Sequence, residues 1–268
     1  MDRYRAANRD LWEAWTPHNL TSPLYDVEGF VAGRETLCPV ELAGVGQVAG
    51  RRLLHLQCHF GLGTLSWVRH GAIATGVDFA PSAIAAAREL SERTGLPATF
   101  VESDLYALPE HLEGEFDVVF TSHGVLGWLP DLEGWARVIA HYLAPGGLLF
   151  LAEAHPVAML FDETRDDREL RLRYPYFHRD EPFVLPVKGS YAAPEAEVSG
   201  TEHFWIHPVS DILGALLRAG LRIESFDEHP FMAWSHFPWM VQRPDGHWEM
   251  PPDAPELPLM LSLRARAP

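Results

Sequence analysis

The feature that most constrains the fold is an alternation of short apolar runs with amphipathic segments between residues 51 and 156. Five runs rich in Val, Phe, Ile and Leu have the length and composition of buried strands: RRLLHLQ (51–57), AIATGVD (72–78), ATFVESD (98–104), FDVVFTS (116–122) and GLLFLAEA (147–154). Three segments between them have helical spacing: 62–70, 81–95 and 131–147. Strands that alternate with helices over short connections run parallel, so we predict an α/β fold with helices on both faces of the sheet.

Three regions depart from this alternation and are rich in aromatic residues. Residues 1–50 are predicted to be helical and to form an N-terminal cap on a main domain of residues 51–268. Residues 157–208 read as an insertion after the fifth strand, and 230–258 as an irregular segment with many prolines. The insertion is followed by a helix over 210–220, a strand over 221–229 and a final strand within 257–268. The aromatic residues either pack in the core or form lids over a pocket, with the insertion as one lid.

Composition excludes several functions. A formal net charge of −16 and the lack of clustered Lys and Arg argue against a nucleic-acid partner, so we expect a small-molecule substrate. Two cysteines are too few for a disulfide framework and suit a reducing compartment. The charged N-terminus does not resemble a signal peptide, and no apolar run approaches the roughly 18 residues of a membrane span, so we expect a cytoplasmic protein with no membrane partner.

The turn after the first strand, HLQCHFGLGTLSW (55–67), is where a doubly wound fold holds a nucleotide-like cofactor. A dinucleotide fingerprint needs G-x-G-x-x-G, and here those places hold Gln57, His59 and Leu62. The second and third glycines let the backbone approach a pyrophosphate and the helix pack on the strand, so a pyrophosphate fits this loop poorly. The phosphate-binding G-x-x-x-x-G-K-[ST] pattern is also absent.

Acidic residues end the second and third strands. Asp78 closes the second strand, where a carboxylate accepts both hydroxyls of a ribose in nucleoside-binding folds. Asp104 follows the third strand within Glu102-Ser103-Asp104-Leu105. The alternative for both acids is a polar turn or helix-capping role.

With the frame changed by one residue, the loop reads as G-x-G-x-G with Gln57, His59 and Gly61 at the glycine positions. Together with the two acids and the order of elements from Leu53 to His155, this resembles class I S-adenosylmethionine (SAM)-dependent methyltransferases, of a small bacterial type whose loop reads HLQCHFG. The resemblance implies a Rossmann-like, doubly wound sheet of seven strands, the last antiparallel, and SAM as cofactor. It also implies that Asp104 accepts from the adenine amino group while the backbone of Leu105 donates to the ring. The expected cofactor-binding residues are Gln57, Cys58, His59, Gly61, Asp78, Phe79, Asp104, Leu105, Ser122 and His123.

His55, Cys58 and His59 also suggest a metal or haem site. Haem attachment needs C-x-x-C-H, which this stretch lacks, and a strand would point the three side chains to different faces. No second cysteine pair completes a zinc site, so we expect no metal.

The sequence says less about the molecule that accepts the methyl group than about the cofactor. The Asn/Asp-Pro-Pro-Tyr signature of amino-methyltransferases is absent after the fourth strand, which leaves a small molecule with an oxygen, nitrogen or carbon nucleophile. His155 is our first candidate for a general base, followed by His207 and His123, because two of them follow strands and the third precedes a helix. Catalysis by proximity alone is the alternative. A non-catalytic SAM-binding or regulatory protein and an NAD-type oxidoreductase remain competing functions.

Overall fold

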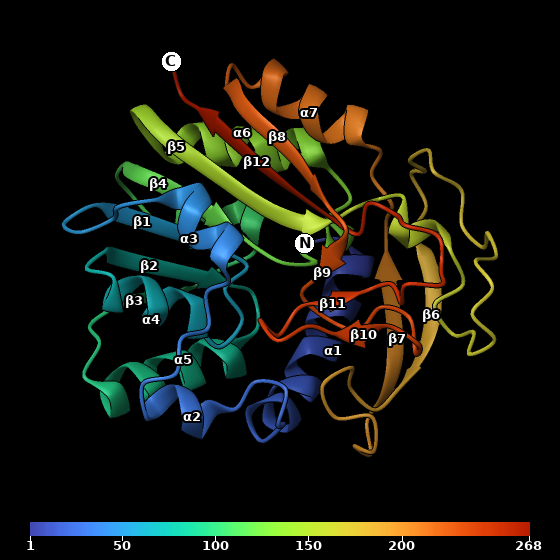
Figure 1. The fold of residues 1–268 in the computed structure, drawn as a ribbon. Coiled ribbons are helices and arrows are strands. Elements are labelled where there is room, and N and C mark those ends of the chain that lie inside the picture. Colours follow the sequence, from blue (N-terminus) through green and yellow to red (C-terminus); the bar gives the residue numbers. More distant parts are fainter.

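The computed structural model describes residues 1–268 and has a central seven-stranded sheet (Figure 1). Its strand order is β3-β2-β1-β4-β5-β12-β8, and β12 runs antiparallel to both of its neighbours. The strands are β1 (Arg52–Leu56), β2 (Ile73–Asp78), β3 (Thr99–Glu102), β4 (Phe116–Thr121), β5 (Leu143–Ala154), β8 (Arg222–His229) and β12 (Met260–Arg266). The predicted α/β fold, with seven strands and an antiparallel last strand, is therefore confirmed.

The two faces of the sheet follow from the period of two in its strands. In β1, Leu54 and Leu56 face the cluster formed with α6 (Leu132–Tyr142) and α7 (Val209–Arg218), and Leu53 faces Trp67 of α4 (Leu62–Arg69). α5 (Pro81–Thr94) continues the α4 side beyond β2 and β3. Figure 1 shows the two groups of helices on opposite sides of the sheet. Ligands in such folds gather beyond the carboxyl ends of the strands.

One predicted boundary was wrong. The helix expected within 131–147, with Pro145-Gly146-Gly147 as its stop and turn, ends at Tyr142. β5 begins at Leu143, which pairs with Phe116 of β4, four residues before the strand start expected at Gly147. Pro145 explains the early end, because proline cannot donate in a helix and its ring pushes Ala144 toward an extended conformation.

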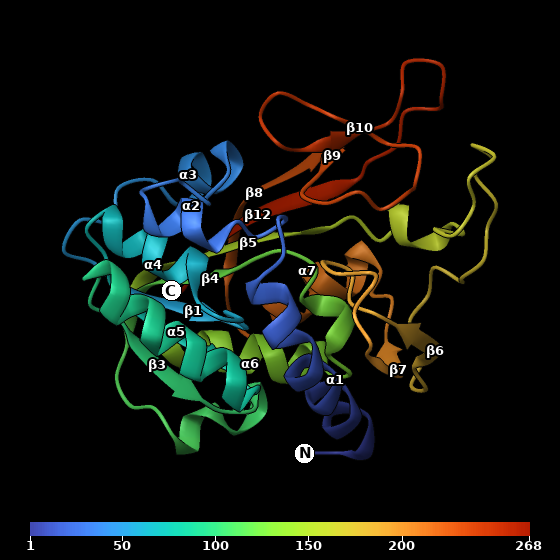
Figure 2. The same cartoon turned by 90° about the horizontal axis from the view of Figure 1, so that it is seen from below.

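The N-terminal 50 residues form α1 (Arg3–Leu20), α2 (Val27–Val31) and α3 (Pro39–Val45). α3 packs on β5 and β12, whereas α1 crosses below the sheet and contacts α5 and β7 (Figures 1 and 2). The insertion contains a hairpin of β6 (Phe183–Lys188) and β7 (Ser199–Phe204). Short 3₁₀ helices η1 (Leu105–Glu110), η2 (Leu126–Trp128) and η3 (Ala158–Leu160) complete the connections.

The segment predicted as irregular, 230–258, contains a small three-stranded sheet. It is formed by β9 (Phe231–Met232), β10 (Val241–Gln242) and β11 (Trp248–Glu249), and it packs through Met232 and Phe237 against the start of the insertion. Two-residue strands have no detectable period, which is why the sequence pattern did not reveal them. No helix has the length and apolar character needed to cross a membrane.

Candidate functional site

A cavity of about 640 Å³ lies at the carboxyl ends of β1, β2, β4 and β5. All three irregular regions contribute to its wall, with Trp12 from α1, Tyr191 and Trp205 from the insertion, and Trp234 from the segment after β9. Segments far apart in the sequence therefore enclose one space, as expected if they act as lids.

The loop after β1 keeps the backbone of a glycine-rich turn although two of its glycines are replaced. φ is +55° at Gln57, +52° at His59 and +80° at Gly61, so all three motif positions are left-handed. Side chains other than glycine adopt this conformation only at a cost. Gly61 cannot be replaced without movement, because a Cβ there would lie 2.7 Å from the ring of Phe100. The predicted cofactor loop thus has a strained backbone, which other contacts in the protein must stabilise.

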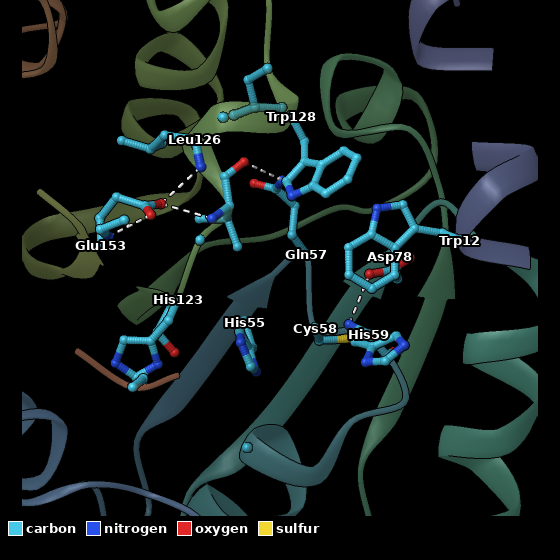
Figure 3. A pocket seen from close by; sticks show the side chains of 18 of the residues that line it. Trp12, His55, Gln57, Cys58, His59, Asp78, His123, Leu126, Trp128 and Glu153 are labelled. Atoms are coloured by element: carbon cyan, nitrogen blue, oxygen red, sulfur yellow. Dashed lines mark hydrogen bonds between the residues drawn. The ribbon is translucent and has the colours of Figure 1, made fainter. Parts of the chain in front are cut away.

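That stabilisation comes from hydrogen bonds and aromatic packing. Gln57 Nε2 donates to the carbonyl of Val125 at 3.1 Å, and the backbone N–H of His59 donates to Asp78 Oδ2 at 2.8 Å (Figure 3). The His59 ring packs edge-on against Trp12, with centroids 5.0 Å apart. Burial lowers the pKa of His59 to about 3, so its imidazole is neutral.

Asp78 ends β2 at the cavity wall and is 9% exposed. Its second oxygen accepts from the backbone N–H of Ala80 at 3.0 Å. Burial raises the pKa of Asp78 to about 6, against the opposing effect of these N–H donors. A carboxyl with a pKa this close to neutrality is well placed to gain from further donors such as ribose hydroxyls, which favour its charged form.

The other predicted cofactor residues also line the cavity: Cys58, Phe79, Leu105, Ser122 and His123. Burial raises the pKa of the Cys58 thiol well above its usual range, so this cysteine is an apolar wall rather than a nucleophile.

Asp104 faces a partner that the sequence did not reveal. Arg5 Nη1 lies 2.7 Å from both of its carboxylate oxygens, and the guanidinium also stacks over Tyr106. The carboxylate further accepts from the backbone N–H of Tyr106 at 3.0 Å. The adenine role predicted for Asp104 therefore stays a prediction in which Arg5 competes for the same oxygens.

A second acid missed by the sequence analysis is Glu153 at the end of β5, 4% exposed. It accepts from the backbone N–H groups of Val125 and Leu126, each at 2.8 Å, and so holds the turn after β4 (Figure 3). Burial raises its pKa. An acid within the otherwise apolar run GLLFLAEA was the signal that could have found it.

The three candidate bases do not lie together. His155 does not line the cavity. Its Nε2 instead lies 2.8 Å from Glu228 of β8. His207 lines the cavity, but its Nε2 contacts the carbonyl of Leu129 at 2.8 Å and burial lowers its pKa to about 4. His123 lines the cavity directly after β4, and its Nδ1 lies 3.8 Å from Glu41. Two of the three candidates, His207 and His123, therefore line the cavity, and the choice of a general base stays a prediction.

Glu41 and Cys38 join His123 in a cluster whose ligand atoms lie within 4.8 Å of one another. Glu41 is 3% exposed. The helix start Cys38-Pro39-Val40-Glu41 has the spacing of a capping box, which was the signal for this acid. His55 and Cys58, which suggested a metal site in the sequence, are not in this cluster.

An aromatic wall, defined here as Trp12, Trp15, Trp128 and Tyr191, covers the loop side of the cavity. Trp12 lies 5.2 Å from both Trp15 and Trp128, in edge-to-face geometry. Glu202 of β7 also lines the cavity, and burial raises its pKa to about 7. The cavity beyond the cofactor loop therefore has a largely aromatic, apolar surface.

Known proteins match both the sequence and this geometry. Residues 54–149 match the model of a methyltransferase domain, which spans β1 to β5 and includes the loop and both acids. The chain is 28% identical over 241 residues to a ubiquinone biosynthesis O-methyltransferase of Xanthomonas euvesicatoria pv. vesicatoria (strain 85-10), covering 87% of this chain and 84% of the relative. A relative of the same description from Bordetella avium (strain 197N) is 26% identical over 206 residues, covering 74% and 81%.

Solved structures share the fold. An S-adenosylmethionine-dependent methyltransferase from Mesorhizobium loti superposes with a TM-score of 0.59 at 24% identity, covering 84% of this chain and 94% of the other. The glycopeptide N-methyltransferase MtfA, solved with SAM, has a TM-score of 0.52 at 17% identity, with coverages of 92% and 95%.

The strand order, the loop geometry and the matching domain model define the class: the protein is an enzyme, a SAM-dependent methyltransferase. S-adenosyl-L-methionine is its cofactor, and the stretch that matches the methyltransferase domain model, residues 54–149, runs from β1 into β5.

Proposed function

We propose that the enzyme transfers the methyl group of SAM to a hydroxyl oxygen of a small, planar and largely apolar molecule. The observation that carries this proposal is the single cavity that joins the cofactor loop to the aromatic wall. Relatives named as O-methyltransferases favour oxygen over nitrogen or carbon as the nucleophile. Aromatic side chains bind planar molecules through large apolar contacts, so the wall favours an aromatic acceptor.

The residues of the cavity fit SAM. The left-handed loop from Gln57 to Gly61 leaves its backbone open to a ligand, and the loop does not need to approach a phosphate, because SAM has none. We infer that Asp78 holds the ribose hydroxyls, and that the wall residues Phe79 and Leu105 hold the adenine. When bound, SAM supplies a methyl group on a positively charged sulfur, and the products are the methylated acceptor, S-adenosylhomocysteine and one proton.

The chain's own groups would orient the acceptor and take up that proton. His155 lies outside the cavity, and the low pKa of His207 makes it a weak base. His123 is therefore our candidate for the proton acceptor. Trp12 and Trp234 would exclude water from the acceptor, and the hairpin with α1 would act as the lid predicted from the sequence.

The test is a screen for release of S-adenosylhomocysteine at saturating SAM, with phenols and catechols compared with amines of the same shape. Turnover of hydroxyl compounds, with methylation at oxygen shown by mass spectrometry, is the expected result. Turnover of amines alone would move the nucleophile to nitrogen. If SAM binds and no compound of either kind is methylated, the competing function of a non-catalytic SAM-binding protein gains support.

Once an acceptor is known, His123→Gln should lower kcat at least tenfold at saturating SAM, because a glutamine side chain cannot take up the proton. His155→Gln is the matched control, since that ring faces Glu228. Equal kcat values for the two variants and the unchanged enzyme would mean that neither histidine takes the proton and that proximity alone accounts for the rate.

A further inference from the structure

Glu41 is a buried carboxylate at the cavity that lacks a strong cationic partner. It lies in the first turn of α3 and is 3% exposed. One oxygen, Oε2, accepts from the backbone N–H of Cys38 at 2.7 Å. The other oxygen, Oε1, lies 3.8 Å from the His123 ring, and the Cys38 thiol is the other neighbouring polar group of the cluster. No Arg or Lys forms an ion pair with Glu41. A carboxylate removed from water is costly unless a positive charge or further donors compensate it.

The position of Glu41 is set by packing on both sides of its segment. Thr36 Oγ1 lies 2.6 Å from Ser66 Oγ of α4, and α3 rests on β5 and β12. These contacts hold the N-terminal end of α3 beside His123, two residues after the end of β4. Glu41 is therefore fixed at the β4 end of the cavity and is not a mobile surface acid.

The sheet order gives the direction in which the cofactor crosses the cavity. Asp104 follows β3, Asp78 ends β2, the strained loop follows β1, and Glu41 lies beside the end of β4. Neighbouring strands lie about 4.8 Å apart, so the successive groups of an extended ligand meet successive strands. A cofactor with its nucleoside over β3 and β2 then places its amino-acid end over β1 and β4. That end of SAM carries an ammonium group.

We propose that the Glu41 carboxylate binds the α-ammonium group of SAM and of S-adenosylhomocysteine. The proposal rests on the placement of the nucleoside given under Proposed function and is independent of the methyl acceptor. Binding would give the buried carboxylate the cation that the protein itself does not supply. It would also make the cavity select for a cofactor with an intact amino-acid tail.

The test compares two ligands by calorimetry: S-adenosylhomocysteine and 5′-methylthioadenosine, which shares the nucleoside and the thioether but lacks the amino-acid tail. Glu41→Gln should weaken S-adenosylhomocysteine roughly ten- to hundredfold, as for loss of a charge-assisted contact, and leave 5′-methylthioadenosine within about threefold. Asp78→Asn should weaken both ligands, because both contain the ribose. Glu28→Gln, an exposed acid of α2, is the matched control and should change neither.

Equal effects of Glu41→Gln on the two ligands, or none, would overturn the proposal. A measurement on the unchanged protein guards against a variant that folds poorly. Affinity for S-adenosylhomocysteine should fall as the pH rises through the pKa of its α-amino group, whereas affinity for 5′-methylthioadenosine should not. A flat profile for both ligands would also contradict the ammonium contact.

Because Glu41 lies in a cluster with Cys38 and His123, metal binding is the alternative role of this carboxylate. If the protein binds Zn²⁺ with high affinity, and this binding is lost in both Cys38→Ser and Glu41→Gln, then Glu41 is a metal ligand and the proposal is overturned. If 5′-methylthioadenosine fails to bind the unchanged protein, the placement of the nucleoside fails with it. Neither outcome depends on finding the methyl acceptor, so failure of the proposed O-methylation remains a separate result.

Discussion

Gln57 and His59 show how side chains other than glycine can occupy a glycine-type loop. Both residues are left-handed, and both are held by contacts of their own side chains or backbone. At Gln57 the hydrogen bond from the side-chain amide to the carbonyl of Val125 connects the loop to the turn after β4. The cost of the conformation is therefore met by local hydrogen bonding that also shapes the cofactor site.

Two substitutions at this position separate conformation from contact. Gln57→Gly should keep affinity for S-adenosylhomocysteine within about threefold, because glycine accepts the conformation freely. Gln57→Val should lose about 1–2 kcal/mol of unfolding free energy and most of the affinity, since a β-branched residue resists the left-handed region. Thermal unfolding and calorimetry measure the two effects. Similar behaviour of the two variants would mean that the positive φ does not matter.

Asp78 should make cofactor binding depend on pH. Its pKa is raised to about 6 by burial, and the ribose role requires the carboxylate. Affinity for S-adenosylhomocysteine should therefore fall as the pH drops below about 6, and Asp78→Asn should be weaker by roughly ten- to hundredfold and lack this dependence. An unchanged pH dependence in the variant would assign the titration to another group.

The same pKa shift makes the stability of the unliganded protein depend on pH in the opposite direction to cofactor affinity. The folded pKa lies above the ordinary value of 3.8, so the unfolded chain loses this proton first. Through this group, stability should decline as the pH rises from about 4 to about 6. Bound cofactor should reverse that trend, which thermal unfolding with and without S-adenosylhomocysteine can show.

At the scale of elements, α1 and the inserted hairpin form one unit. The Asn8 side chain donates to the carbonyl of His203 at 2.7 Å and accepts from its N–H at 2.9 Å, which is a two-point bond to β7. Trp15 Nε1 donates to the carbonyl of Gly189 at 2.8 Å. The predicted cap and the predicted lid are thus joined, although 195 residues separate Asn8 from His203.

Breaking this bond should loosen both elements together. Asn8→Ala leaves two backbone groups of His203 without partners, at a cost of about 1–3 kcal/mol. Hydrogen exchange should then accelerate in both 3–20 and 199–204, while β1 and β4 stay protected. Asp10→Ala, at an exposed position on the same helix, is the matched control. Faster exchange confined to α1 would show that the two elements open independently.

For the whole molecule, the cavity depends on the first helix. α1 contributes Arg5, Trp12 and Trp15 to its wall. The two core clusters that hold most of the sheet, α6 and α7 contain no residue of α1, and only Trp12 and Leu20 touch the cluster under α4 and α5. Deletion of residues 1–20 should abolish turnover and weaken S-adenosylhomocysteine while circular dichroism of the sheet is retained. Trp12→Ala is the milder variant should the truncated chain aggregate. Full activity of either protein would remove α1 from the active site.

Much of the fold followed from the sequence alone because its causes are local. Apolar runs with period two and helical segments between them require a parallel sheet, and an acid at the end of the second strand reaches its carboxyl edge wherever the strand lies. The positions of Asp78 and of the loop from Gln57 to Gly61 at this edge were predictable for this reason, whereas their roles in binding stay predictions. The left-handed backbone of that loop was not predictable, because Gln and His rarely adopt this conformation and so do not indicate it in a sequence.

Tertiary structure decided the rest, because those features depend on partners distant in the sequence. His155 follows a strand as predicted, but its backbone N–H donates to the carbonyl of Leu259 and its ring meets Glu228, both near strands added late in the chain. Asp104 meets Arg5 only because α1 lies beside η1, where the Arg5 guanidinium stacks over Tyr106. Glu41 faces His123 because α3 packs on β5. The sequence by itself determined the sheet and the cofactor loop, whereas packing between remote segments decided which charged groups face the cavity.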